Sequence, residues 1–228
     1  MESPIRAVQA PYYEGGGDMR TPPPDLESLI LKERIVYLGM PLVPQVTELI
    51  IAELLYLQYE DPEKPIKIYI NSTGTSSYSG EPVGWETEAF AICDTIRYIK
   101  PPVQTICLGT AMGTAAMLLS AGTKGSRASL PHATIVLQQP KSYTQGQATD
   151  IQIRAKEVIA NKTTMVDLLS QNTGQTREQL NKDMDRLFYM TPYQAIEYGL
   201  IDKVLEGDKN VPQALQDQKS ESSETSQS

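Results

Sequence analysis

The most informative stretch of the chain runs from residue 105 to residue 122 and reads TICLGTAMGTAAMLLSAG. Its β-branched start, glycine corner and apolar continuation predict a buried strand that turns sharply into a helix. Many α/β hydrolases carry their nucleophile on such a corner. Here the corner holds Met112 and Gly113, and neither residue has a hydroxyl or a thiol. The spacing therefore predicts a hydrolase-like architecture without its nucleophile.

The single histidine also argues against a catalytic relay. His132 follows Leu130-Pro131 and precedes a predicted strand, so we expect it in a surface turn. A Ser-His-Asp or Cys-His arrangement needs an imidazole next to the nucleophile. No spacing of His, Cys or carboxylate residues suggests a metal site, and we expect no cofactor.

A polar loop follows a predicted strand at residues 71–75, which read NSTGT. Its backbone N–H groups could face an anion or a developing oxyanion. The loop continues into SSYSGEPVGWE, which could line a cleft, block it or simply connect two elements over the surface.

Strand and helix patterns alternate along the chain, and this alternation predicts one α/β domain with a parallel sheet crossed by helices. The expected strands are 34–39, 66–71, 103 onward, 133–139 and 201–204, and the expected helices are 43–60, 85–100, the segment up to 122, and 150–172. Two more helices are expected to begin at Thr176 and at Thr191-Pro192.

The helix predicted at 150–172 is too long to lie wholly over a small sheet. Thr149 and Gln152 suggest its N-terminal cap, and Gly174 its end. Its apolar residues recur at helical spacing and form one stripe: Ile151, Ala155, Val158, Ile159, Met165, Val166 and Leu169. The stripe indicates either a projecting helix that binds a protein partner or an ordinary core helix.

Composition narrows the function class. The formal net charge of −8 argues against a nucleic-acid surface, which needs clustered Lys and Arg.

Cys93 and Cys107 lie in apolar segments and are expected to be core residues of a protein from a reducing compartment. The uncharged stretch between Lys100 and Lys124 contains several Pro and Gly residues, so we expect no membrane span. Residues 1–25 are expected to be mobile and residues 208–228 to form a disordered polar tail.

Several segments, taken in order, resemble the proteolytic subunit of the ATP-dependent Clp protease, ClpP. They are LILKERIVYLGMPL (29–42), EDPEKPIKIYIN (60–71), AICDTIRYIKPPVQTICLG (91–109), SAGTKGSRASLP (120–131), QGQATDIQIRAKE (145–157), DMDR (183–186) and AIEYGLIDKV (195–204). The resemblance covers about residues 27–205. It implies a ClpP/crotonase-like α/β fold over 26–207 whose projecting handle, about 133–172, interleaves with another across two stacked heptameric rings.

The resemblance also implies three altered catalytic positions. The family's G-x-A-S-M-G-A reads GTAMGTA (109–115), so the serine position is Gly113. The M-I-H-Q-P segment reads VLQQP (136–140), so the histidine position is Gln138, and the acid of D-R-D falls on Leu187. This pattern is similar to ClpR, the inactive paralogue of cyanobacteria and plastids.

Other family positions follow from the same resemblance. The oxyanion loop falls on Thr73-Gly74-Thr75, so the vestigial oxyanion region comprises Gly74, Thr75 and Thr114, with an insertion within 72–84. Arg186 matches a ring-contact arginine, with Asp183 and Asp185 nearby. The ATPase-docking pair Tyr-x-Tyr reads Lys67-Ile68-Tyr69, so we expect weak docking there, or docking through Tyr12 and Tyr13.

These observations predict a non-catalytic, ring-forming subunit of a Clp serine protease in the cytoplasm or plastid stroma. Its expected partners are an active ClpP-type paralogue in a mixed heptameric ring, a Clp AAA+ ATPase chaperone and the polypeptide substrate of the complex, with no nucleic acid and no membrane. Two alternatives stay open: an active hydrolase that uses Thr114 or Ser142 with Lys124 or Lys141, and a crotonase-type acyl-CoA binder.

Overall fold

The computed structural model describes residues 26–207, so the two predicted mobile termini, including Tyr12 and Tyr13, lie outside the described residues. The elements in chain order are α1 (Leu26–Lys32), β1 (Ile35–Leu38), α2 (Pro44–Glu60), β2 (Ile66–Ser72), α3 (Glu86–Tyr98), β3 (Val103–Met112), α4 (Thr114–Ser120), β4 (Arg127–Ser129), β5 (Thr134–Leu137), α5 (Ala148–Thr173), α6 (Arg177–Met184), β6 (Phe188–Met190), α7 (Pro192–Tyr198) and β7 (Lys203–Val204).

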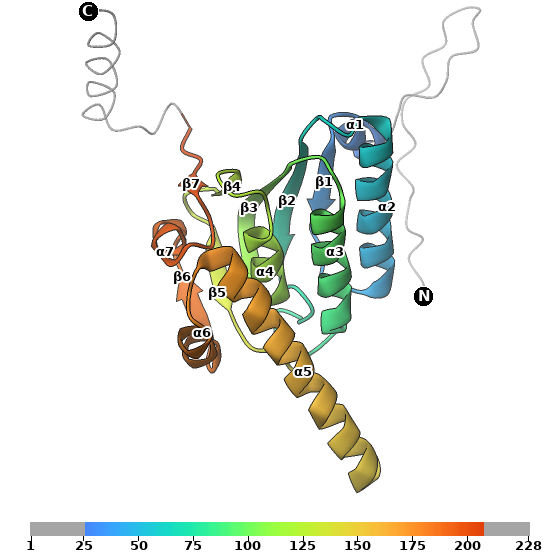
Figure 1. The fold of residues 1–228 in the computed structure, drawn as a ribbon, viewed down its shortest axis with the longest axis vertical. Coiled ribbons are helices and arrows are strands. Elements are labelled where there is room, and N and C mark those ends of the chain that lie inside the picture. Colours follow the sequence, from blue (N-terminus) through green and yellow to red (C-terminus); the bar gives the residue numbers. More distant parts are fainter. Residues whose placement is uncertain (1–25, 208–228) are drawn as a thin grey trace, which may run out of the picture.

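The strands form one sheet in the order β1-β2-β3-β4-β7, and all of these neighbours are parallel. The long strand β3 also pairs with β5 near its end, and β6 adds to β5 in the antiparallel direction. Figure 1 shows α2, α3 and α4 together on one face of this sheet. The predicted parallel sheet crossed by helices is confirmed.

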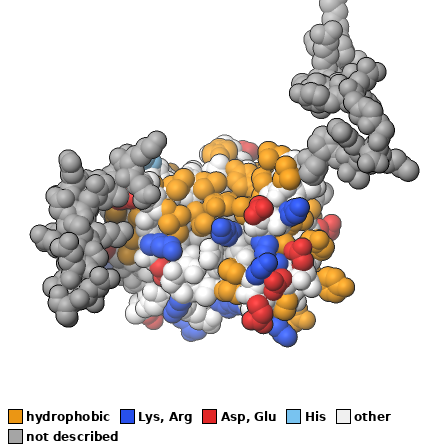
Figure 2. All heavy atoms as spheres, turned by 90° about the horizontal axis from the view of Figure 1, so that it is seen from above, with side chains coloured by type: hydrophobic (Ala, Val, Ile, Leu, Met, Phe, Trp, Pro, Cys, Tyr) orange, Lys and Arg blue, Asp and Glu red, His pale blue; other side chains and the backbone are white. Residues whose placement is uncertain are grey.

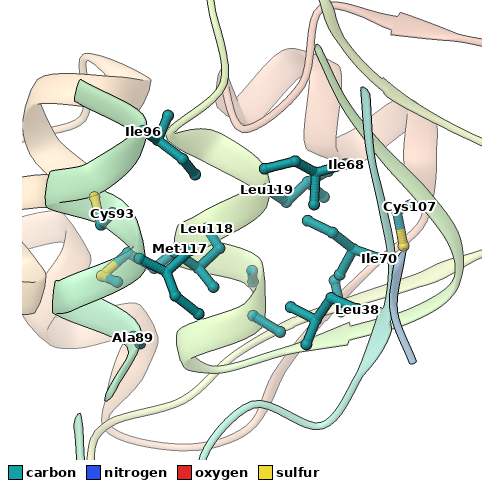
Figure 3. Packing of buried hydrophobic residues seen from close by; sticks show 14 of the residues in the cluster. Leu38, Ile68, Ile70, Ala89, Cys93, Ile96, Cys107, Met117, Leu118 and Leu119 are labelled. Atoms are coloured by element: carbon teal, nitrogen blue, oxygen red, sulfur yellow. The ribbon is translucent and has the colours of Figure 1, made fainter. Parts of the chain in front are cut away.

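The core lies between the sheet and these helices. Alternate residues of β2 are buried because successive side chains of a strand point to opposite faces. In Figure 3 the buried side chains of α4, including Met117 and Leu119, stand between those of α3 and those of β1 and β2. Cys93 and Cys107 are fully buried free thiols, as expected. Burial raises their pKa values to about 11 and about 12, so both stay protonated at neutral pH.

The two halves of α5 differ: the C-terminal half is an ordinary core helix, and the N-terminal half projects, while its binding to a partner stays a prediction. The C-terminal half is packed on the body through Met165, Val166, Leu168 and Leu169. In the N-terminal half Ile153 and Ile159 are 68% and 65% exposed, and Figure 1 shows these first turns extending away from the body. The predicted stop at Gly174 is confirmed by its left-handed φ of 80°. The predicted cap at Thr149 is wrong, because the helix begins at Ala148 and Gln147 occupies the cap position.

The caps of the last two helices agree with the sequence. The Thr176 hydroxyl accepts from the Gln179 N–H, and Thr191 with Gln194 forms a complete capping box. The short strands β4 and β6 were not predicted, since three-residue strands are too short to show a period and are stabilised by the strands beside them. The helix α1 was not predicted either. No helix of residues 26–207 is both long and apolar enough to cross a bilayer, and the uncharged stretch after Lys100 contains β3.

Candidate functional site

The corner between β3 and α4 is built around Gly113. This residue has a φ of 52°, a conformation that favours glycine, and its N–H donates to the Val136 oxygen of β5 at 2.8 Å. A Cβ atom built on Gly113 would lie 3.0 Å from both Cγ and Nε2 of Gln138. The structure therefore places Gly113 and Gln138, the residues expected at the serine and histidine positions, side by side.

Gln138 is buried, with 6% of its surface exposed. Its Nε2 donates to the Ser76 hydroxyl at 3.3 Å, and its Oε1 has no hydrogen-bond partner among the described residues. A carboxamide has no basic nitrogen near neutral pH, so Gln138 cannot accept a proton from a nucleophile.

Leu187 lies just before β6. The antiparallel register pairs Phe188, the residue after Leu187, with Leu137, the residue before Gln138. Its side chain is 47% exposed and apolar. It offers no oxygen that could orient an imidazole.

In the region expected to be a vestigial oxyanion hole, the backbone N–H groups of Gly74 and Thr75 bond to nearby hydroxyls. The Gly74 N–H donates to the Ser72 hydroxyl at 3.0 Å, and the Thr75 N–H donates to the Thr114 hydroxyl at 3.0 Å. The Ser72 hydroxyl in turn donates to the Met40 oxygen at 2.6 Å. An oxyanion hole needs N–H donors aimed at the reacting carbonyl. These two donors are already engaged within the protein.

The polar loop of the 72–84 insertion folds into a short hairpin that comprises residues 76–84. Ser76 bridges Pro82, the Ser77 N–H donates to the Glu81 oxygen at 2.8 Å, and the Val83 N–H donates to the Thr75 oxygen at 2.9 Å. One end of this hairpin, Ser76, contacts Gln138 as described above. The loop is therefore a hairpin whose base lies beside the Gly113 corner through Ser76, while most of residues 78–83 are exposed.

The structure does not bring the residues of the hydrolase alternative together. The Thr114 hydroxyl is buried against Thr75, which it contacts through the Thr75 N–H and hydroxyl. Ser142, Lys124 and Lys141 are exposed, although a lysine base must lose its hydration to be neutral at pH 7. His132 is exposed in a turn, as predicted. No group of His, Cys, Asp or Glu within residues 26–207 could hold a metal ion.

The three residues expected at a ring contact differ in their surroundings. Arg186 and Asp185 are exposed, and neither forms an ion pair with another residue of the 26–207 region. Asp183 is half-buried and accepts from the Tyr198 hydroxyl at 2.7 Å. Burial together with this hydrogen bond raises the pKa of Tyr198, so the phenol remains a donor. Asp183 thus joins α6 to α7 within the chain.

The expected docking residues lie on the sheet face that α2, α3 and α4 leave uncovered. Lys67 is exposed, and Tyr69 is half-buried on the same face of β2. Tyr37, which no sequence pattern singled out, is paired in register with Tyr69 and is 53% exposed. Paired residues of neighbouring strands share a face, so the strand register was the signal that could have found it.

A further apolar area lies at the end of the molecule that carries α1 and the last turns of α2. Figure 2 looks down on this end and shows hydrophobic side chains grouped beside several Lys and Arg side chains. Leu26 and Tyr59 are 71% and 89% exposed, and Leu29 and Tyr56 about half exposed. Exposed apolar groups of this kind are typical of protein contact surfaces.

The fold and site together define an α/β protein with a strand–glycine–helix corner of hydrolase type in which a glycine faces a glutamine.

The model of the Clp protease family matches residues 23–208. An ATP-dependent Clp protease proteolytic subunit-like protein of Synechocystis sp. is 68% identical, over 92% of this chain and 98% of its own length. Its counterpart in Synechococcus elongatus is 66% identical, over 92% and 96%. The ATP-dependent Clp protease proteolytic subunit-related protein 4, chloroplastic, of Arabidopsis thaliana is 56% identical, over 85% of this chain and 63% of its own length. The chain belongs to the Clp protease family.

Proposed function

We propose that this chain is a non-catalytic, ring-forming subunit of an ATP-dependent Clp protease complex and assembles with active ClpP-type subunits. The observation that carries the proposal is that Gln138 occupies the space into which a side chain at position 113 would point. The corner that presents a nucleophile is present, but it holds neither nucleophile nor base. In serine proteases the loss of the nucleophile alone lowers the rate by about a million-fold.

The names of the relatives support this proposal. The two cyanobacterial relatives are called proteolytic subunit-like and the Arabidopsis relative proteolytic subunit-related and chloroplastic. We accordingly place this chain in the cytoplasm of a cyanobacterium or in the plastid stroma, in a complex that degrades unfolded polypeptides delivered by a Clp AAA+ ATPase.

The alternatives have less support. A serine–lysine or threonine–lysine hydrolase requires a contact that Thr114, Ser142, Lys124 and Lys141 do not make. A crotonase-type acyl-CoA binder would hold its thioester oxygen on free backbone N–H groups. The N–H groups of Gly74 and Thr75 are instead occupied by hydroxyls.

A peptidase assay tests the absence of catalysis. We expect the purified chain to leave a fluorogenic peptide and casein intact and to resist labelling by a fluorophosphonate. An active ClpP-type subunit purified in the same way serves as the positive control. Labelling of this chain at any serine or threonine, together with casein degradation, would overturn the proposal.

Co-expression with active ClpP-type chains, followed by native mass measurement, tests assembly. The exposed apolar residues Ile153 and Ile159 of α5 are the proposed contact surface. Changing both to Asp should abolish co-purification, because a charge buried at an apolar interface is costly. Changing Asp94, an exposed residue of α3, to Lys is the control for an altered surface charge and should leave the complex intact. A complex that survives both Asp substitutions would show that α5 does not mediate ring contacts.

For the ATPase we propose docking on the uncovered sheet face through Tyr37 and Tyr69, weakened by the neighbouring Lys67. The Lys67→Tyr variant should therefore bind the ATPase more tightly than the wild-type chain when both are tested in the same complex. Equal binding would indicate that this subunit contributes no docking site there.

A further inference from the structure

The projecting half of α5 has few contacts that could fix its direction. All of the buried residues of this helix lie between Met165 and Leu169, so the preceding seventeen residues, 148–164, include none. A helix segment without buried apolar contacts is expected to fray or bend, because its stability must then come from its own hydrogen bonds. A side chain of the body that contacts this half will therefore have a large effect on the direction of the helix.

The contacts that hold the projecting half of α5 come from Trp85 and Glu86, the two residues that follow the hairpin of residues 76–84. The guanidinium carbon of Arg154 lies 3.7 Å from the centre of the Trp85 ring, the geometry of a cation–π contact. Arg154 is also paired with Glu157 at 2.6 Å, which limits its freedom further. Although it lies on the projecting half, its side chain is only 21% exposed.

Glu86 adds a second contact one residue later. It is the first residue of α3 and is 4% exposed, which is unusual for a carboxylate. The Asn161 side chain and the positive charge of Arg154 are both close enough to act to lower the pKa of Glu86. Burial nevertheless raises the pKa of Glu86, with Glu157 adding to the rise. Trp85 and Glu86 thus hold α5 at two points that are two helical turns apart.

The same segment reaches the Gly113 corner at its other end. Ser76 accepts from Gln138, and the Thr75 oxygen receives the N–H groups of Val83 and Gly84, which closes the hairpin. Beyond Gln138, Gln139 accepts from Lys162 of α5 at 2.9 Å. Two short paths therefore connect the corner with the projecting helix, one through the hairpin and one through residues 138–139.

We propose that residues 76–86 form a brace that fixes the direction of the projecting half of α5 and couples it to the Gly113 corner. The brace is a property of the chain itself and does not depend on whether the subunit is catalytically inactive. In an assembly, the brace would hold the projecting half of α5 in one direction relative to the body of this subunit. In a subunit without the brace, the direction of this half could vary.

Hydrogen exchange followed by mass spectrometry tests the proposal on the full-length chain. Trp85→Leu removes the ring face but keeps an apolar side chain, and it should speed exchange at residues 148–162 about tenfold. Trp85→Phe keeps an aromatic face and should stay within about threefold of the wild type. Exchange at β3 and at residues 165–173 should change in neither variant, which also shows that the fold is intact.

Two more variants separate the brace from a local effect of Trp85. Replacing residues 77–81 by two glycines should loosen residues 148–162 while leaving Trp85 in place. Tyr78→Ala, at a hairpin side chain that is 79% exposed, is the matched control and should have no effect. If Trp85→Leu does not fold, Arg154→Gln removes the cation from the other side. Exchange at 148–162 within twofold of the wild type in folded Trp85→Leu or Arg154→Gln would overturn the proposal, as would an unchanged rate in the shortened hairpin.

Discussion

Gly113 faces the Gln138 side chain: a Cβ atom built on the glycine would lie 3.0 Å from the carboxamide Nε2. A side chain at position 113 and the Gln138 side chain would therefore compete for one space. Any side chain at position 113 would have to displace Gln138, which is itself bonded to Ser76 of the hairpin. A serine introduced at position 113 would face the Gln138 amide, which cannot accept its proton as a base would.

Gly113→Ser should therefore not create a hydrolase. We expect no peptide cleavage and no fluorophosphonate labelling, because no proton acceptor faces the hydroxyl. We also expect a loss of about 1–3 kcal/mol in the free energy of unfolding, since φ is 52° at this position and Gln138 must move. Urea denaturation and a fluorogenic peptide assay measure the two effects.

The triple variant Gly113→Ser, Gln138→His, Leu187→Asp provides the comparison. It supplies all three triad side chains but leaves the Gly74 and Thr75 N–H groups bonded to hydroxyls. We expect at most weak labelling. Robust labelling of the single variant would contradict our view of the site.

Thr114→Val should loosen the hairpin. The Thr114 hydroxyl is the acceptor for the buried Thr75 N–H, and its loss leaves that donor unsatisfied, at a cost of about 1–3 kcal/mol. Urea denaturation should show the loss, and hydrogen exchange should show faster exchange at residues 75–84. Thr110→Val, at a half-buried position of β3, the strand that precedes α4, is the control. Equal stability of the two variants would mean that Thr114 does not anchor the loop.

The ion pair between Arg127 and Asp202 joins β4 to the chain just before β7, at 2.6 Å. The Arg127 side chain is 5% exposed, so removing its partner leaves a buried charge uncompensated. Asp202→Asn should cost about 3 kcal/mol at pH 7 in a urea titration. Asp94→Asn, at an exposed carboxylate of α3, should cost less than about 0.5 kcal/mol.

The same pair predicts a dependence on pH. Burial raises the pKa of Asp202, but hydrogen bonds from Arg127 and Gly125 outweigh it, so the folded pKa lies below the ordinary value of 3.8. The stability supplied by the carboxylate is therefore complete above pH 3.8 and is lost as the pH falls through the folded pKa. The stability difference between wild type and Asp202→Asn should be constant from pH 7 to about pH 5 and shrink below pH 3.8. A difference that grows at low pH would contradict the assigned charge.

The caps of α6 and α7 offer a matched pair. Thr191→Ala should cost about 1–2 kcal/mol, because it breaks a reciprocal capping box. Thr176→Ala should cost about 0.5–1 kcal/mol, because its hydroxyl makes a single cap bond at 3.2 Å. Thermal unfolding of both variants ranks them, and the reverse order would show that the box adds nothing here.

Local patterns predicted most elements of the fold. The Thr-Pro start of α7, the glycine that ends α5 and the apolar runs of β2 and β3 are signals that lie within a few residues of one another. The cap of α5 was wrong because Thr149 and Gln152 fit a capping pattern in sequence, whereas the helix already begins at Ala148. The strands β4 and β6 have three residues each and are stabilised by the strands beside them, which no local window contains.

The sequence by itself determined which side chains stand at the corner, and hence that Gly113, Gln138 and Leu187 supply neither nucleophile, base nor acid. Only the tertiary structure decided how they are arranged: that Gly113 faces Gln138, that the hydroxyls of Ser72 and Thr114 accept from the N–H groups of Gly74 and Thr75, and that Trp85 packs against Arg154. The physical reason is that side-chain chemistry belongs to each residue, whereas these contacts join segments about 25 to 70 residues apart, or neighbours held by a turn, and depend on strand register and packing.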